Sequence, residues 1–297
     1  MNRIFCILLM LLTFTTPPLQ AQELHDSSSI NKVRLGLFTA SSASLYATSL
    51  IVLNEMWYKG YPKSGFHFTN DNDQWMQIDK LGHAFTAYYQ SLIGIEGLKW
   101  SGVDDRKSII YGSLFGIIFQ TPIEILDGFS ANWGASWGDL VANTMGSALA
   151  FSQYYFWNEQ KVLFRLSFMP TVYGDMRTDV FGNNLPSKIL KDYNGHNFWL
   201  SFPINFINPR IPEWLCLSIG YGAEEMLAGS KRTTASEFIH YNPYRQFYLS
   251  LDINTLKIPT KHKWLKAILV ATSMIKIPAP ALEFNSRNEF RFHPLHF

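Results

Sequence analysis

Hydrophobic residues between positions 32 and 157 recur at three- and four-residue intervals, a pattern that predicts helices. We expect four helices, at about 34–58, 80–98, 107–124 and 138–157. The first has no charged residue between Arg34 and Glu55, so its apolar stretch reaches the ~20 residues needed to cross a bilayer. It is also rich in Gly, Ala, Ser and Thr, which favour close helix packing in lipid. The alternative is a water-soluble four-helix bundle with these small residues at its crossings.

Beyond residue 161 the pattern changes to short runs of aromatic and branched residues separated by Gly, Pro and Asn. Four runs predict strands: "FRLSFMPTVYG", "HNFWLSFPINF", "EWLCLSIGYG" and "RQFYLSLDIN". Residues in the last run alternate as expected for an antiparallel sheet with one wetter side. One face carries Phe247, Leu249, Leu251 and Ile253, and the other carries Tyr248, Ser250 and Asp252.

One segment of this half, "KHKWLKAILVATSMIK", has helical spacing instead. Trp264, Ile268 and Ile275 fall on one side and three lysines (Lys261, Lys263, Lys266) on the other. Such a basic amphipathic helix suits either an anionic lipid surface or the covering of a sheet, and we expect it to cover the sheet.

These patterns predict an α+β fold, in which a membrane-type four-helix bundle is followed by an antiparallel β-rich region with one amphipathic helix. We expect three parts: a signal peptide at 1–21, a helical domain with a polar cluster at 30–160, and a β-rich domain at 161–297. A small outer-membrane barrel is an alternative for the second half. It is disfavoured because Pro294 interrupts the last strand and fewer than the minimum of about eight strands are recognisable.

The N-terminus places a single Arg before an apolar run from Ile4 to Phe14, followed by two prolines and Leu19-Gln20-Ala21. This is the build of a secretory signal peptide cleaved after Ala21. Cleavage would remove Cys6 and leave Cys216 alone, so we expect no internal disulfide. The net charge of +2 and the scattered basic residues argue against nucleic-acid binding. The high apolar content, 47% against 16% charged, favours an envelope or membrane protein.

The second predicted helix opens with "QIDKLGHAFT", which contains Asp79, Lys80 and His83. Asp79 and His83 are four residues apart, so the carboxylate can orient the imidazole ring and raise its basicity, as in many catalytic and metal sites. A simpler interpretation makes Asp79 the N-cap of the helix and His83 an ordinary core residue.

The third helix ends in "FQTPIEILDGF", with Glu124 and Asp127 three residues apart. The helix dipole opposes carboxylates at a C-terminus, so they need a hydrogen-bond donor, a proton or a cation. The fourth helix begins within "GASWGDLVANTMG", with Asp139 near its N-terminus and Asn143 one turn later. Gly146 in the same helix permits a close approach of another helix.

If the three helices pack as neighbours, Asp79, Glu124 and Asp139 converge at one rim with His83 and Asn143 below them. Several carboxylates at short range do not all ionise without a cation, a shared proton or a ligand. We therefore predict a site, with a purely structural hydrogen-bond network as the alternative. The expected catalytic residues are His83, Glu124 and Asp139; the expected binding residues are Asp79, Lys80, Asp127 and Asn143. A divalent cation, if bound, would be held by His83, Glu124, Asp127 and Asp139.

The motif "DKLGH" followed by "E..DGFSANWGASWGDLVAN..G" resembles the YfiM-like family of predicted periplasmic lipoproteins, and more distantly the VanZ-like membrane proteins. The resemblance covers roughly residues 54 to 157. The shared pattern includes Asp79, Lys80, His83, Glu124, Asp139, Asn143 and Gly146. It implies a helical protein of the bacterial cell envelope, exported to the periplasmic side and membrane-associated, but no established activity.

Two functions fit these observations. The first is a non-enzymatic envelope protein whose polar cluster fixes helix packing and which binds membrane lipid or another envelope component. The second is a hydrolase or transferase that acts on a lipid-linked or cell-wall substrate through His83 and the carboxylates. The sequence has no G-x-S-x-G nucleophile motif, phosphate-binding Gly loop or zinc-type His/Cys spacing, which favours the first.

Overall fold

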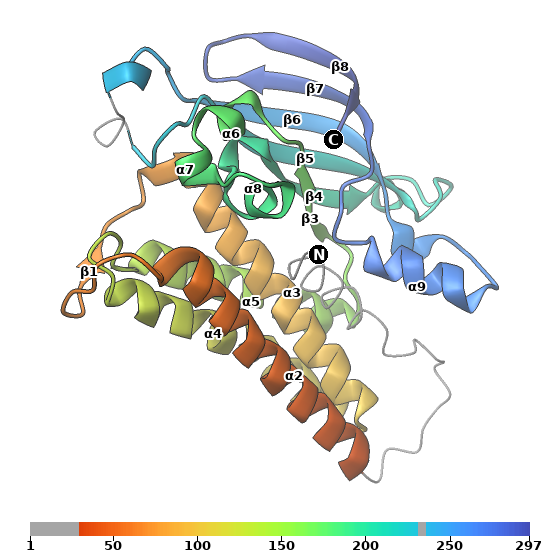
Figure 1. Cartoon of the computed structure of the whole chain (residues 1–297). Helices are drawn as coiled ribbons and strands as arrows, with labels where there is room; N and C mark the ends of the chain where they lie inside the picture. The colour runs from red at the N-terminus through yellow and green to blue at the C-terminus, as the bar shows by residue number, and fades with distance from the viewer. Residues whose placement is uncertain (1–29, 231–235) are drawn as a thin grey trace. The chain divides into compact units, whose positions relative to one another are not determined.

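The computed structural model describes residues 30–230 and 236–297, so the predicted signal peptide lies outside the described residues. Long helices are followed by an antiparallel sheet, which confirms the α+β class (Figure 1). The described chain forms two compact units. The helical unit comprises residues up to 72 together with 82–160, and the sheet unit comprises 73–81 together with 161–297.

The long helices agree with the predicted segments within a few residues. They are α2 (Lys32–Leu53), α3 (Ile78–Trp100), α4 (Asp105–Gly128) and α5 (Trp137–Trp157). A π-helical turn (Asn54–Tyr58) extends α2, and two short parallel strands, β1 (Phe68–Thr69) and β2 (Ala135–Ser136), pair before α5. Helix α3 begins at Ile78, so Asp79 lies within its first turn, and the prediction that it is the N-cap was wrong.

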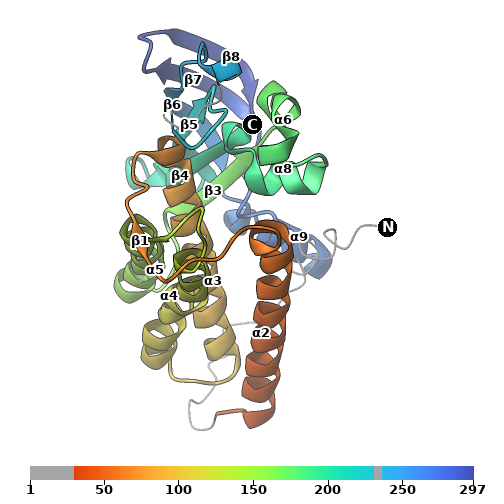
Figure 2. The same ribbon diagram turned by 60° about the vertical axis from the view of Figure 1, so that its left-hand side comes forward.

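Glycine residues set the distances between the helices of this unit. A Cβ atom at Gly146 of α5 would lie 2.0 Å from the carbonyl oxygen of Ala84 in α3. A Cβ at Gly116 of α4 would lie 2.3 Å from the carbonyl oxygen of Ala87. Backbone therefore packs on backbone at these crossings, and α3, α4 and α5 run side by side (Figures 1 and 2). The predicted close approach at Gly146 is confirmed.

Among the described residues, two helices, α2 and α4, are long and apolar enough to cross a membrane. Length and composition are weak support for a span, because the core helix of a soluble protein satisfies the same criteria. The membrane-type bundle therefore stays a prediction.

The sheet unit is built on six antiparallel strands in sequence order. They are β3 (Leu163–Phe168), β4 (His196–Pro203), β5 (Leu215–Glu224), β6 (Tyr244–Ile253), β7 (Ala279–Asn285) and β8 (Phe290–His296). Short helices α6 (Val172–Met176), α7 (Thr178–Phe181) and α8 (Leu185–Lys191) connect β3 to β4, and α9 (Lys263–Ala271) lies between β6 and β7. The four predicted strands are present. β8 continues across Pro294, which an edge strand tolerates because an outward-facing N–H is not needed for pairing.

The segment before β7 pairs with the free edge of β3. Leu166 donates its N–H to the carbonyl of Met274 and accepts from the N–H of Lys276, at 2.9 and 3.0 Å. The same stretch of chain then continues as β7 and pairs with β6. One segment thus contacts both β3 and β6, so the sheet must curl. Ile275 belongs to this pairing, and its predicted place in the amphipathic helix was wrong.

The polarity of the sheet is the reverse of the expected one. Its polar face is buried: Arg165 and Lys276 are 0% exposed, and both approach Asp252, which is 1% exposed. The Asp252 carboxylate also accepts hydrogen bonds from Ser201 and Ser218. The apolar face is the exposed one. It comprises Leu217 and Ile219 of β5, Phe247, Leu249 and Leu251 of β6, Leu282 and Phe284 of β7, and Phe290 and Phe292 of β8, each between 38% and 74% exposed.

Helix α9 does not cover the sheet as predicted. None of its residues is fully buried, and Trp264 and Ile268, one turn apart, are 66% and 49% exposed. The hydroxyl of Thr255, in the turn after β6, donates to the carbonyl of Leu269 and attaches the helix to one end of the sheet. Trp264 and Ile268 therefore remain available for contact, whereas Leu265 and Leu269 are half-buried.

Replacement of Gly146 by Ala should destabilise the protein. The added methyl group meets the Ala84 backbone, which cannot move without shifting α3, so we expect a loss of about 1–3 kcal/mol in the free energy of unfolding. Gly36→Ala is the matched control in α2, because nothing lies within 4 Å of the new Cβ. It should be neutral or stabilise by up to about 1 kcal/mol. Thermal and urea unfolding followed by circular dichroism would measure both, and equal effects would contradict the packing described.

Candidate functional site

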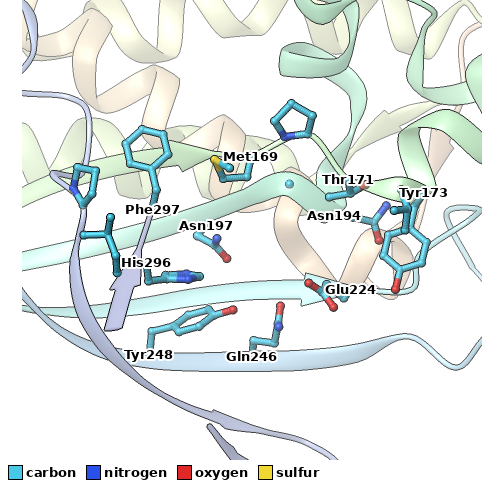
Figure 3. A pocket seen from close by; sticks show the side chains of 15 residues that line it. Met169, Thr171, Tyr173, Asn194, Asn197, Glu224, Gln246, Tyr248, His296 and Phe297 are labelled. Atoms are coloured by element: carbon cyan, nitrogen blue, oxygen red, sulfur yellow. The ribbon is translucent and has the colours of Figure 1, made fainter. Parts of the chain in front are cut away.

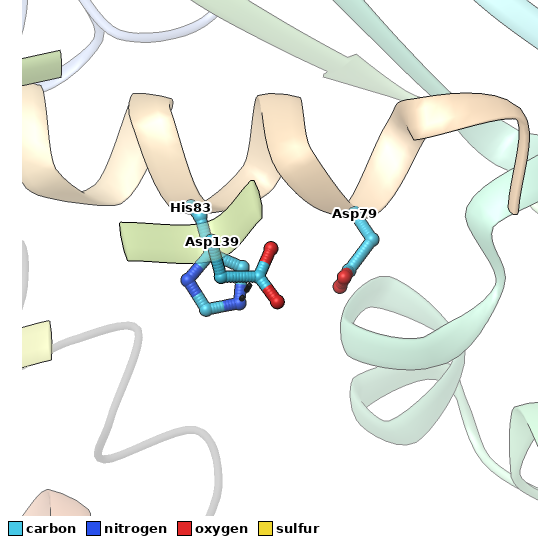
Figure 4. A group of neighbouring side chains, drawn as sticks. All are labelled: Asp79, His83 and Asp139. Atoms are coloured by element: carbon cyan, nitrogen blue, oxygen red, sulfur yellow. Dashed lines mark ion pairs between the residues drawn. The ribbon is translucent and has the colours of Figure 1, made fainter. Parts of the chain in front are cut away.

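Three helices of the helical unit bring polar side chains together. His83 lies in the second turn of α3, Glu124 in the last turns of α4, and Asp139 and Asn143 in the first turns of α5. The chain separates these residues by up to about sixty positions, and the glycine crossings bring the helices close enough for the side chains to meet. Figure 4 shows the His83 ring beside the Asp139 carboxylate, with Asp79 one turn earlier on α3.

The His83 ring lies between two carboxylates. Its Nδ1 is 3.2 Å from Oδ1 of Asn143 and 3.7 Å from Oε1 of Glu124. On its other side, Nε2 is 3.9 Å from Oδ1 of Asp139. The histidine side chain is 15% exposed, whereas the side chains of Glu124 and Asp139 are 3% and 6% exposed and Asn143 is buried. The ring is therefore the most accessible member of a largely buried cluster.

The contact with Asn143 orients the His83 ring. With the amide oxygen of Asn143 as acceptor, the proton of a neutral imidazole resides on Nδ1. The Nε2 atom then turns a lone pair toward the Asp139 carboxylate. A lone pair on Nε2 and the Asp139 carboxylate would repel each other. Their proximity is favourable only if the ring is protonated or if a cation lies near both groups.

Glu124 is held at one oxygen. Its Oε2 accepts from the backbone N–H of Ser136 at 3.0 Å. Its Oε1 is buried and has no hydrogen-bond partner among the described residues. Burial raises the pKa of Glu124 from 4.5 to about 7, an effect that His83 and the Ser136 N–H oppose and that Asp139 and Asp127 reinforce. At neutral pH this carboxyl group therefore exchanges a proton readily.

The loop before α5 holds the cluster in place, and sequence reasoning missed its residues. Ser136, not Asp139, is the N-cap of α5: its hydroxyl accepts from the N–H of Asp139 at 3.2 Å and donates to Asp71 at 2.5 Å. A Ser three residues before an Asp, ahead of a helical run, was a detectable signal for this cap. Asp71 gave no such signal, because it reaches Ser136 through the β1–β2 pairing.

Three further predicted residues have partners of their own. The phenol of Tyr58 donates to Asp127 at 2.8 Å, and this contact also could not be foreseen from the sequence. Asp79 accepts from the Tyr193 hydroxyl at 2.9 Å and pairs with Lys80 at 3.3 Å. Both of these partners, Tyr193 and Lys80, belong to the sheet unit. The predicted binding roles of Asp79, Lys80 and Asp127 stay predictions.

This arrangement can carry out two kinds of chemistry. A carboxylate and an imidazole nitrogen that point toward a common space are ligands for a transition-metal cation. An imidazole beside a carboxyl group with a pKa near 7 can also transfer protons at neutral pH.

The comparisons with known proteins reach the same segment of the chain. Residues 65–155 match a family described as predicted periplasmic lipoproteins (DUF2279). No curated protein and no solved structure matches the chain. The matched range contains His83, Glu124, Asp139 and Asn143, and the match supports the predicted export and envelope association. It does not point to the YfiM-like or VanZ-like group in particular.

The raised pKa of Glu124 predicts a specific pH dependence of stability. A carboxyl group with a pKa of about 7 in the folded protein and 4.5 in the unfolded chain binds more protons when folded. Its contribution is fully present below pH 4.5 and is lost as the pH rises through 7, a change of about 3 kcal/mol. Glu124→Gln should therefore gain stability relative to the natural protein between pH 5 and pH 8, measured by urea unfolding with EDTA present.

The exposed Glu237→Gln is the control and should leave the pH dependence unchanged. Parallel stability curves for the natural protein and Glu124→Gln over this pH range would show that the carboxyl group does not titrate as described.

Proposed function

We propose that this envelope protein binds a divalent cation at His83 and Asp139, with Asn143 orienting the ring and Glu124 exchanging a proton beside it. The observation that carries the proposal is the orientation of the His83 ring. Its Nδ1 is directed to Asn143 and its Nε2 to the Asp139 carboxylate, at 3.2 and 3.9 Å.

The donor set fits such an ion. Metal-binding histidines usually donate their second ring N–H to an oxygen, and the Asn143 amide oxygen lies 3.2 Å from Nδ1 of His83, in position to accept such a bond. Nitrogen and oxygen ligands of one tetrahedral zinc ion lie about 3.3–3.6 Å apart, so a small movement of either side chain would suffice. Two protein ligands from this unit would leave positions open for water or for a substrate oxygen.

An ion with open positions, next to a carboxyl group that exchanges a proton, suits hydrolysis or group transfer. A bound cation supplies a polarised water or substrate oxygen. Glu124, with a pKa of about 7, would accept the proton that such a reaction releases at neutral pH. Together with the periplasmic family match, this favours a lipid-linked or cell-wall substrate, in line with the second function inferred from the sequence.

A structural role is the second candidate, and one network favours it. Ser136 binds Glu124 through its N–H, and its hydroxyl contacts both Asp71 and the N–H of Asp139. These bonds join α4, α5 and the loop after β1. If helix fixation were the whole function, substitution of His83 would reduce stability and no cation would bind.

The exposed apolar face of the sheet supports association with an anionic lipid surface. Nine large apolar residues are exposed on four strands, while most polar residues of β5, β6 and β7 are buried, as in membrane-embedded sheets. The buried polar residues are Ser218, Gln246, Ser250, Asp252, Glu283 and Asn285. Within the same unit, α9 exposes Trp264, and exposed lysines accompany it at 261, 263 and 266. Tryptophan and lysine at the rim of an apolar surface match the interface and the anionic headgroups of a bilayer.

Cation binding can be measured directly. We expect saturable binding of Zn²⁺ or Mn²⁺ to the purified full chain by isothermal titration calorimetry after removal of bound metal with EDTA. His83→Ala and Asp139→Asn should abolish it, and Asn143→Ala should weaken it about 10-fold or more through loss of ring orientation. The exposed His240→Ala is the control and should bind as the natural protein does.

Circular dichroism of each variant separates the two candidates. Loss of cation binding by a folded His83→Ala supports the cation site. No binding by the natural protein, together with a lower unfolding temperature for His83→Ala, would contradict it and leave the structural role.

Lipid contact can be tested at a single position of the apolar face. A fluorophore attached to Leu249→Cys should shift to shorter wavelength and be quenched by brominated lipids in vesicles that contain phosphatidylglycerol. The same label at the exposed Asn183→Cys, in the same unit, should remain in water. Natural Cys216 is 0% exposed and should not react. Equal water exposure of both labels would exclude lipid contact through this face.

A further inference from the structure

The sheet unit contains a cavity of about 790 Å³ on the polar side of the sheet. The segment from Met169 to Tyr173 borders it on one side. The turn at Asn194 and Gly195, Pro278, β4, β5, β6 and the end of β8 supply the rest of its wall. Figure 3 shows the side chains of Asn197, Gln246, Tyr248 and Glu224 directed toward this common space. A volume of this size is within the range of small-molecule binding sites.

Polar groups at the base of the cavity lack protein partners. Asn197 and Tyr248 are 9% and 5% exposed, yet neither the amide of Asn197 nor the hydroxyl of Tyr248 has a hydrogen bond to another described residue. Their polar atoms face the open space of the cavity, so they can hydrogen-bond a molecule that enters it. Gly222 maintains the space around Asn197, since a Cβ there would lie 2.0 Å from its Oδ1.

The composition of the wall indicates the class of ligand. Its side chains include amides, phenols and one carboxylate, Glu224, but no lysine or arginine. A phosphate or carboxylate ligand would therefore find no countercharge. Apolar and aromatic groups complete the wall: the Tyr248 and His296 rings stack at 4.5 Å, and Met169 and Phe297 lie nearby. Amides and hydroxyls that bind directionally, beside flat apolar rings, suit a neutral hydroxylated ring compound.

We propose that this cavity binds a neutral saccharide, with Asn197 and Tyr248 hydrogen-bonded to its hydroxyl or acetamido groups and Glu224 accepting from a further hydroxyl. The volume is sufficient for one or two sugar rings. The site lies entirely within the sheet unit and requires neither the cation nor the residues around His83. It would give the protein a means of holding a glycan independently of any reaction in the helical unit.

The test is binding of defined sugars to the full chain, observed by saturation-transfer NMR and titration calorimetry. The probes are the β-1,4-linked disaccharides of N-acetylglucosamine and of glucose, with glucuronate and glucose 6-phosphate as anionic comparisons. We expect saturable binding of at least one neutral disaccharide at millimolar concentration or below, and weaker or no binding of the anionic sugars.

Two substitutions locate the site. Tyr248→Phe removes one hydroxyl and preserves the ring, and Asn197→Ala removes an amide that has no protein hydrogen bond to lose. Each should weaken binding about 10-fold or more, while Asn183→Ala, an exposed position of the same unit, should not. If Asn197→Ala does not fold, Tyr248→Phe decides. No binding of either neutral disaccharide, preference for the anionic sugars, or unchanged affinity in Tyr248→Phe would overturn the proposal.

Discussion

At the crossings of α3 with α4 and α5, backbone meets backbone because the crossing positions are glycine. A Cβ at Gly146 or Gly116 would lie 2.0 or 2.3 Å from a carbonyl oxygen of α3, so any larger residue separates the helices. The side chains of the site have fixed lengths, and His83 reaches Glu124 and Asp139 at 3.7 and 3.9 Å only at this helix spacing. The electrostatics of the cluster follow from it, because burial between close helices is the main cause of the raised pKa of Glu124.

Sequence periodicity was sufficient to place the long helices, four of the six strands and the residues that meet around His83. Those predictions depend on the spacing of residues along the chain. Side chains three or four residues apart lie on the same face of a helix, so the spacing predicts which residues share a face. The residues outside the three helices that contact the cluster were not predicted, and the reason is different. Tyr58 reaches Asp127 across 69 positions and Asp71 reaches Ser136 across 65, through a loop and a two-residue strand pair. Contacts made by irregular segments produce no periodic pattern in the sequence. Among these residues only Ser136 has a local sequence signal, the spacing of a helix cap.

The errors in the sheet unit have a related origin. Alternation divides a strand into two faces, but it does not say which face is buried. The expectation that the polar side of β6 is the wetter one used the average behaviour of soluble sheets. The outcome depends instead on a contact with no sequence signal, the pairing of Leu166 with the segment Met274–Lys276. The same pairing ends the helical pattern early and leaves Ile275 outside α9.

That pairing also explains why the apolar face is the outer one. A curled sheet has one inner face, and here the inner face holds Arg165, Lys276 and Asp252. Opening the curl would break the backbone bonds between β3 and the segment Met274–Lys276, and it would separate Arg165 of β3 from Asp252 of β6. Curling the sheet in the opposite direction would bury the apolar side chains but would remove those same bonds. The contacts of Asp252 and the pairing of β3 therefore favour the observed direction of curl. Because the polar residues occupy the inner face, the large apolar residues lie on the outer face. Their exposure to water is unfavourable, and contact with lipid would remove this hydrophobic cost.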